Sequence, residues 1–109
     1  MVEAAPFTAI PDLTALIQVQ PEATVSRTAF RAPGLRVVLF GFDAGQELTE
    51  HTAAMPVLLQ VLSGRLSITA DGRTEELVPG GFIHLDTRVP HAVYAHEPTT
   101  MQLTMLDAR

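Results

Sequence analysis

The stretch "EHTAAMPVLLQVLSGRLSITADG", Glu50–Gly72, decides the fold expected for this chain. Its apolar run Val57–Leu62 has the length of a short strand and ends at a Ser–Gly pair. The next run, 65–70, alternates apolar and polar residues, as a strand with one buried face does. Asp71–Gly72 then gives a strong hairpin signal, because both central positions of a type I′ turn need positive φ. The stretch therefore predicts two strands and a tight turn into a third.

Short strands separated by turns continue on both sides of this stretch. The last run, 101–106, places Met101, Leu103 and Met105 on one face, as a half-buried strand would. Only Pro11–Gln18 is predicted to be helical, with an aspartate as its cap. Strands at this spacing predict an all-β sandwich or barrel. The predicted strands are 35–42, 57–62, 65–70, 74–78, 82–86, 91–96 and 101–106.

Length and composition exclude several classes of function. The 109 residues suit one domain, and the net charge is −5, with seven basic residues that are all arginine and lie scattered. This charge balance argues against nucleic-acid binding by the chain alone. The absence of lysine and cysteine excludes Schiff-base chemistry, disulfides and thiolate ligands. No apolar run approaches the roughly 18–20 residues of a membrane helix, and no signal pattern opens the chain, so we expect a cytoplasmic protein without a membrane partner.

Glycine and histidine residues in the middle of the chain resemble the first motif of the cupin superfamily, in its small single-domain members. Gly45, His51 and Gly64 occupy the positions of the opening glycine, the first histidine and the closing glycine. Ala53 stands where the family has its second histidine, and Val57 stands where it has a glutamate. The chain therefore resembles a subgroup of small cupins whose metal-binding motif is degenerate.

The second cupin motif is also matched in part. Gly80 and His91 fit it, whereas Asp86, Arg88 and Ala95 replace its proline, second glycine and asparagine. The two motifs together keep the glycines that shape the barrel, but only two of the four usual metal ligands.

The resemblance covers roughly residues 22–106 and implies a cupin-type β-barrel, a jelly-roll-like double-stranded β-helix with a short N-terminal helix or turn. It implies a single domain over 1–109, with an N-terminal extension at 1–20 and the barrel at 21–107. It also implies a homodimer. A physical reason agrees, because the runs 35–40 and 57–62 are apolar on both faces and need cover on the face outside the barrel.

The metal site that the resemblance implies is incomplete in this sequence. Three histidines and a glutamate converge in metal-binding cupins, and such ligands suit divalent transition metals. His51 and His91 alone would make a weak site, since catalytic zinc usually has three protein ligands. Alternation turns Gln60 and His96 away from the interior, and His84 points outward if its two neighbours point inward. We therefore expect no cofactor, or a weakly bound divalent transition metal at His51 and His91.

Three hypotheses for function follow. The first is a small-molecule-binding cupin with an apolar pocket, in which His51, His91, Val57, Met55 and Arg88 contact the ligand and the histidines supply any acid–base chemistry. The second is a metal-dependent enzyme, a dioxygenase or isomerase of a small polar substrate, with a third ligand not identified in the sequence. The third is a sensory module that binds a ligand and acts with a partner protein.

Overall fold

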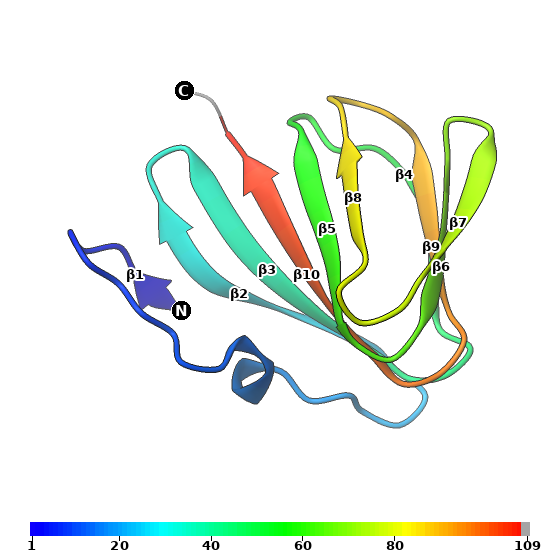
Figure 1. Cartoon of the computed structure of the whole chain (residues 1–109), viewed down its shortest axis with the longest axis horizontal. Helices are drawn as coiled ribbons and strands as arrows, with labels where there is room; N and C mark the ends of the chain where they lie inside the picture. The colour runs from blue at the N-terminus through cyan, green and yellow to red at the C-terminus, as the bar shows by residue number, and fades with distance from the viewer. Residues whose placement is uncertain (108–109) are drawn as a thin grey trace.

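The computed structural model describes residues 1–107 and folds them into two facing β-sheets (Figure 1). Within these residues the elements are β1 (Val2–Glu3), the 3-10 helix η1 (Leu13–Leu16), β2 (Thr24–Ala32), β3 (Leu35–Phe42), β4 (Glu47–His51), β5 (Val57–Ser63), β6 (Leu66–Ala70), β7 (Arg73–Leu77), β8 (Phe82–Leu85), β9 (His91–Ala95) and β10 (Thr99–Leu106). One sheet has the order β1-β2-β3-β10-β5-β8, and the other has the order β4-β9-β6-β7. The predicted all-β barrel is confirmed.

The connectivity is that of a jelly roll. From β3 onward the chain crosses between the two sheets at every connection except the β6–β7 hairpin. The connections β2–β3, β4–β5, β6–β7 and β8–β9 all lie at one end of the barrel, the upper end in Figure 1. We call this the loop end. No helix among residues 1–107 is long and apolar enough to span a membrane.

The predicted strands agree with the observed ones to within two residues at either end. The hairpin signal is confirmed as well, since Asp71 and Gly72 have φ of 50° and 74°, and Ala70 pairs with Arg73 across the turn. The strands β1, β2 and β4 were not predicted. β4 in particular carries mostly exposed residues, so it has little of the apolar alternation that marks a half-buried strand.

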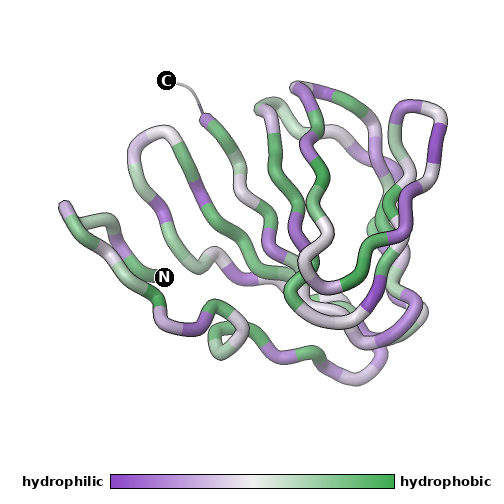
Figure 2. Tube along the Cα trace, in the orientation of Figure 1, coloured by the Kyte–Doolittle hydropathy of each residue, from purple (hydrophilic) through white to green (hydrophobic). Residues whose placement is uncertain are grey.

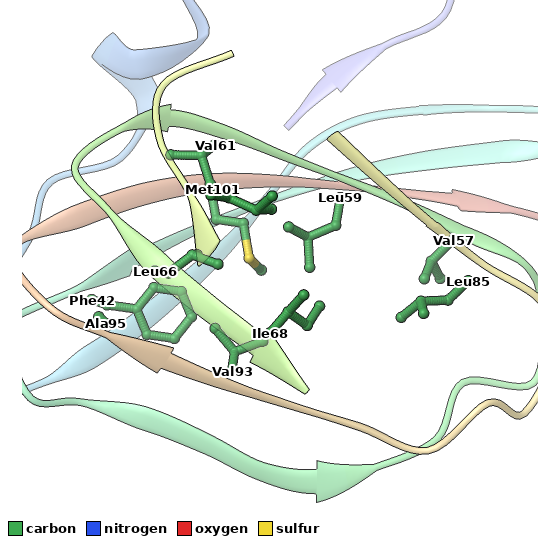
Figure 3. Close-up of a cluster of buried hydrophobic side chains, with 11 residues drawn as sticks. Phe42, Val57, Leu59, Val61, Leu66, Ile68, Leu85, Val93, Ala95 and Met101 are labelled. Atoms are coloured by element: carbon green, nitrogen blue, oxygen red, sulfur yellow. The ribbon is translucent and has the colours of Figure 1, made fainter. Parts of the chain in front are cut away.

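The core lies between the sheets and is built from the inward faces of both. Phe42, Leu59 and Leu66 have no exposed surface, and Figure 3 shows their side chains meeting those of Ile68 and Met101. Along each strand these residues alternate with polar or half-exposed ones, so apolar and polar segments follow one another along the tube in Figure 2. The predicted inward face of the last strand is confirmed, because Met101 is buried and Leu103 and Met105 pack on the core.

The short helix or turn predicted at Pro11–Gln18 is not confirmed as an α-helix, but a shorter turn forms inside this range with the predicted aspartate as its cap. Only a single 3-10 turn forms, in which the Asp12 side chain accepts a hydrogen bond from the Thr14 N–H (3.0 Å). The chain is already extended at Ile17, a β-branched residue that favours extended backbone (φ −141°, ψ 142°).

The extended segment after η1 covers the outer face of β2 and β3. The Arg27 side chain donates a hydrogen bond to the Leu16 carbonyl (3.2 Å). The backbone of Gly41 also lies close to this segment, since a Cβ added to Gly41 would be 3.3 Å from the Gln18 carbonyl oxygen. Leu39, which faces away from the barrel interior, is fully buried as a result. The N-terminal segment thus covers part of the second apolar face predicted from the sequence.

Candidate functional site

Two histidines meet on neighbouring strands at the loop end of the barrel. His51 is the last residue of β4, and His91 is the first residue of β9 and its direct partner across the strands. Their ring centroids are 4.2 Å apart, at an interplanar angle of 57°. His91 is 5% exposed, whereas His51 is exposed. The structure therefore brings together the two site residues that the sequence analysis ranked first.

A β-bulge places His51 on the same face as His91. Leu48 pairs with Val93, and three residues later His51 pairs with His91, only two residues from Val93. Strict alternation from the inward Leu48 would turn His51 outward, so the extra residue in β4 reverses its direction. Bulges often re-aim a side chain beside a functional site. We attribute the juxtaposition of the imidazoles to this bulge.

The protonation of one ring nitrogen in each histidine follows from its hydrogen-bond partner. The Nδ1 atom of His51 lies 2.8 Å from the Thr49 carbonyl oxygen, and the Nδ1 atom of His91 lies 3.0 Å from the Val89 carbonyl oxygen. A carbonyl oxygen can only accept, so each Nδ1 carries the proton and donates it. In the neutral imidazole, Nε2 is then the acceptor.

The other two ligand positions of the cupin motif lie in the apolar core. Val57 is 1% exposed and pairs with Leu85 of β8, and Ala53 packs against the same core. Within residues 1–107 there is no group of three or more His, Cys, Asp or Glu side chains that could hold a metal ion. The donor set therefore does not fit the four-ligand metal centre of the family.

The remaining polar candidates face outward, as strand alternation predicted for Gln60 and His96; for His84 the structure decides what the sequence left open. Gln60 lies between the buried Leu59 and Val61 on β5, and His84 is half exposed, with Nε2 3.8 Å from the Asp86 carboxylate. His96 follows β9 and contacts the Ser67 hydroxyl on the outer face (2.5 Å). None of these three side chains is on the face that carries His51 and His91.

No contact joins Met55 or Arg88, the other predicted ligand contacts, to the imidazole pair among the ring contacts and hydrogen bonds of the described residues. Met55 lines a separate cavity of about 300 Å³ together with Gly34 and Met105. The Arg88 side chain is exposed, and its residue has a left-handed backbone (φ 62°). Its N–H donates to the Ala53 carbonyl (2.8 Å), a contact that sequence reasoning missed and that ties the β8–β9 connection to the β4–β5 connection.

An ion-pair network lies on the outer face of the four-stranded sheet, away from the histidine pair. Arg65 Nη1 is 2.6 Å from Glu76 Oε1, and Arg65 Nε is 3.7 Å from a carboxylate oxygen of Glu97. The hydrogen bond from Arg65 lowers the pKa of Glu76, and the same bond raises the pKa of Arg65. This network joins β6 and β7 to the turn after β9.

The two facing sheets and the paired histidines at their loop end define the molecule as a jelly-roll barrel with a polar pair at the barrel mouth. Residues 38–107 match the family model for the cupin domain. The chain therefore belongs to the cupin family, as the two sequence motifs suggested. No curated protein matches the chain.

Solved structures show the same fold. A conserved protein of unknown function from Streptococcus pyogenes is 28% identical, covers 96% of this chain and 92% of its own length, and has a TM-score of 0.83. A cupin 2 conserved barrel domain protein from Leptotrichia buccalis is 28% identical (TM-score 0.80), and the match covers 86% of this chain and 46% of that protein. A cupin superfamily protein from Desulfitobacterium hafniense is 23% identical, with 86% of each chain covered and a TM-score of 0.80.

Proposed function

We propose that this chain is a small-molecule-binding cupin that contacts its ligand through His51 and His91 at the loop end of the barrel. The observation that carries the proposal is the fixed orientation of the two rings. Both Nδ1 atoms donate to backbone carbonyls, so both Nε2 atoms are left as the groups that can meet a ligand. Neutral, they accept hydrogen bonds from a hydroxyl or an amine.

The apolar surroundings complete the proposed site. Val57 and Leu85 lie below the loop end in the buried core, so a ligand there would combine a polar group with an apolar body. Histidine also suits proton transfer near neutral pH, so acid–base chemistry without a metal is compatible with the pair.

The histidine pair is tested by nuclear magnetic resonance of the imidazole nitrogens. We expect both Nδ1 atoms to be protonated, and a screen of small alcohols, acids, sugars and phenols to yield a compound that shifts both Nε2 resonances. His51→Ala or His91→Ala should abolish that binding. The matched control is His96→Ala, which removes an imidazole from the outer face and should leave binding unchanged. A binding compound that leaves both Nε2 resonances unmoved would contradict the proposal.

A weakly held divalent transition metal is the second candidate. Metal-binding histidines usually donate their other ring nitrogen to a carbonyl or carboxylate, and both histidines do so here. Elemental analysis of protein purified without a chelating tag tests this alternative. Near-stoichiometric metal that disappears in His51→Ala and His91→Ala would replace the first proposal with a metal-binding cupin.

We also propose that the protein forms a homodimer through the outer face of β10, β5 and β8. The N-terminal segment lies against β2 and β3, and the strand registers align two rows of outward side chains beyond it. These outward side chains include one histidine and no other ionisable group, so they carry no formal charge while that histidine is neutral. Two copies of this acidic chain can therefore meet here without repulsion between carboxylates. The rows are Gln102, Gln60 and Phe82, and Thr104, Leu58 and His84.

A further inference from the structure

A cavity of about 600 Å³ opens at the side of the barrel, between the edge strand β7 of one sheet and the edge strand β8 of the other. Neither His51 nor His91 lines it. No motif or strand pattern in the sequence predicts this cavity. Its apolar lining comes from inward residues of both sheets and from the β8–β9 connection: Ile68, Ala70, Leu77, Ile83, Leu85 and, in the connection, Val89.

Two charged residues of β7 lie on the inner face of the sheet. Glu75 pairs with the buried Ile68, and Arg73 pairs with Ala70, so both share the face of the buried Leu77. Both line the cavity, and Arg73 Nε lies 3.6 Å from the Glu75 carboxylate. Inward charges on an edge strand guard against pairing with other chains, and here they also form a polar wall beside the apolar lining.

The charged groups around the cavity carry a negative excess. Three acidic residues line it: Asp71, Glu75 and Asp86. Two basic residues also line the cavity. Arg73 Nε is 3.6 Å from the Glu75 carboxylate. His84 lies at the cavity edge with its side chain on the outward face of β8, and its Nε2 is 3.8 Å from the Asp86 carboxylate and charged only when protonated. Even with both basic groups charged, one negative charge remains. The net charge of −5 on the whole chain acts in the same direction.

We propose that this cavity binds a small organic cation, an amine with a compact apolar body. The apolar body lies against the apolar lining at Ile68 and Leu85, and the ammonium group lies among the carboxylates of the rim. This goes beyond the function proposed for the histidine pair, because none of the groups that recognise the cation belongs to that pair.

The test uses three probes of similar shape and different charge: phenethylamine, phenethyl alcohol and hydrocinnamate. Each is titrated at neutral pH and low salt into nitrogen-labelled protein, and the amide shifts of the cavity residues give the affinity and the location of binding. We expect the amine to bind most tightly, the alcohol more weakly and the carboxylate most weakly. The affected amides should cluster at Ile68, Leu77, Ile83 and Leu85.

Variants on one strand separate charge recognition from general effects. Glu75→Gln should weaken amine binding about two- to fivefold, as expected for a partly exposed charge contact, and leave alcohol binding unchanged. The matched control is Glu76→Gln, the same change one residue along β7 on the outer face, which should leave amine binding unchanged. Ile83→Trp should fill the cavity and weaken both probes.

Several results would overturn the inference. Equal binding of the three probes would show an apolar hollow without charge recognition. Equal losses in Glu75→Gln and Glu76→Gln would show a general field of the acidic chain. Shifts that follow the amine but cluster at His51 and His91 would assign the cation to the loop end.

Amine binding that persists unchanged in His51→Ala is the expected result. It would show that this cavity acts independently of the function proposed for the histidines.

Discussion

Replacing Gly64 with alanine should destabilise the fold by about 2–5 kcal/mol. Gly64 joins β5 to β6 with φ of 85°, a conformation that costs an L-residue about 1–2 kcal/mol. An added Cβ would also collide with the Pro98 carbonyl oxygen and would lie 2.7 Å from the Thr99 Cα. These are backbone atoms held by hydrogen bonds between the buried Thr99 hydroxyl and the backbone of Arg65 (3.1 Å), so we add about 1–3 kcal/mol for overpacking.

Gly45→Ala is the matched control for this prediction. Gly45 has φ of 83°, but an added Cβ there would meet nothing within 4 Å. It should therefore lose only the conformational part, about 1–2 kcal/mol. Any gain from a stiffer unfolded chain applies to both variants and cancels in the comparison.

The assay is urea unfolding followed by far-ultraviolet circular dichroism, since the chain has no tryptophan and one tyrosine. The two variants should differ by about 1–3 kcal/mol in their free energy of unfolding. In thermal unfolding, each kcal/mol lost should lower Tm by roughly 4–8 °C. Equal losses in the two variants would refute the reasoning, because they would show that the turn at Pro98 and Thr99 yields without cost.

Three further predictions concern the core, the ion-pair network and the dimer. Leu59→Ala should cost about 2–5 kcal/mol in urea unfolding, because Leu59 is fully buried between the sheets. Arg65→Met should raise the pKa of Glu76 in a carboxyl titration, because the hydrogen bond from Arg65 lowers that pKa in the folded protein. The stability that the pair contributes is therefore fully present above the unfolded pKa of Glu76 and is lost as the pH falls through the lowered, folded pKa. Leu58→Glu should convert the dimer to a monomer in analytical sedimentation. The control Thr69→Glu, on the outer face of the other sheet, should remain a dimer. Dimers in both variants would contradict the proposed interface.

Features that depend on a few neighbouring residues could be predicted from the sequence. The Asp71–Gly72 turn needs only two residues with positive φ, and the structure has them. Alternation placed Gln60 and His96 on the faces where they lie, because side chains point to opposite faces at successive positions of a strand. Alternation also predicts that Tyr94 points away from His91, and its side chain is exposed.

The candidate site was predictable only in part. The cupin motifs named His51 and His91, and the structure pairs them. Met55 was also named and lines another cavity, and Arg88 was named and has an exposed side chain. A motif fixes positions along the chain, whereas the direction of a loop side chain depends on how two connections pack on each other, as the Arg88 to Ala53 hydrogen bond shows.

By itself, the sequence determined the all-β class, most strands, the hairpin at Asp71–Gly72 and the identity of the two histidines. Only the tertiary structure decided that a bulge in β4 turns His51 toward His91, and that Arg73 and Glu75 border a cavity between edge strands of different sheets. The physical reason is the range of the interactions. A turn and an alternating face are set by adjacent residues, but a bulge and a gap between sheet edges arise from pairing between segments far apart in the chain.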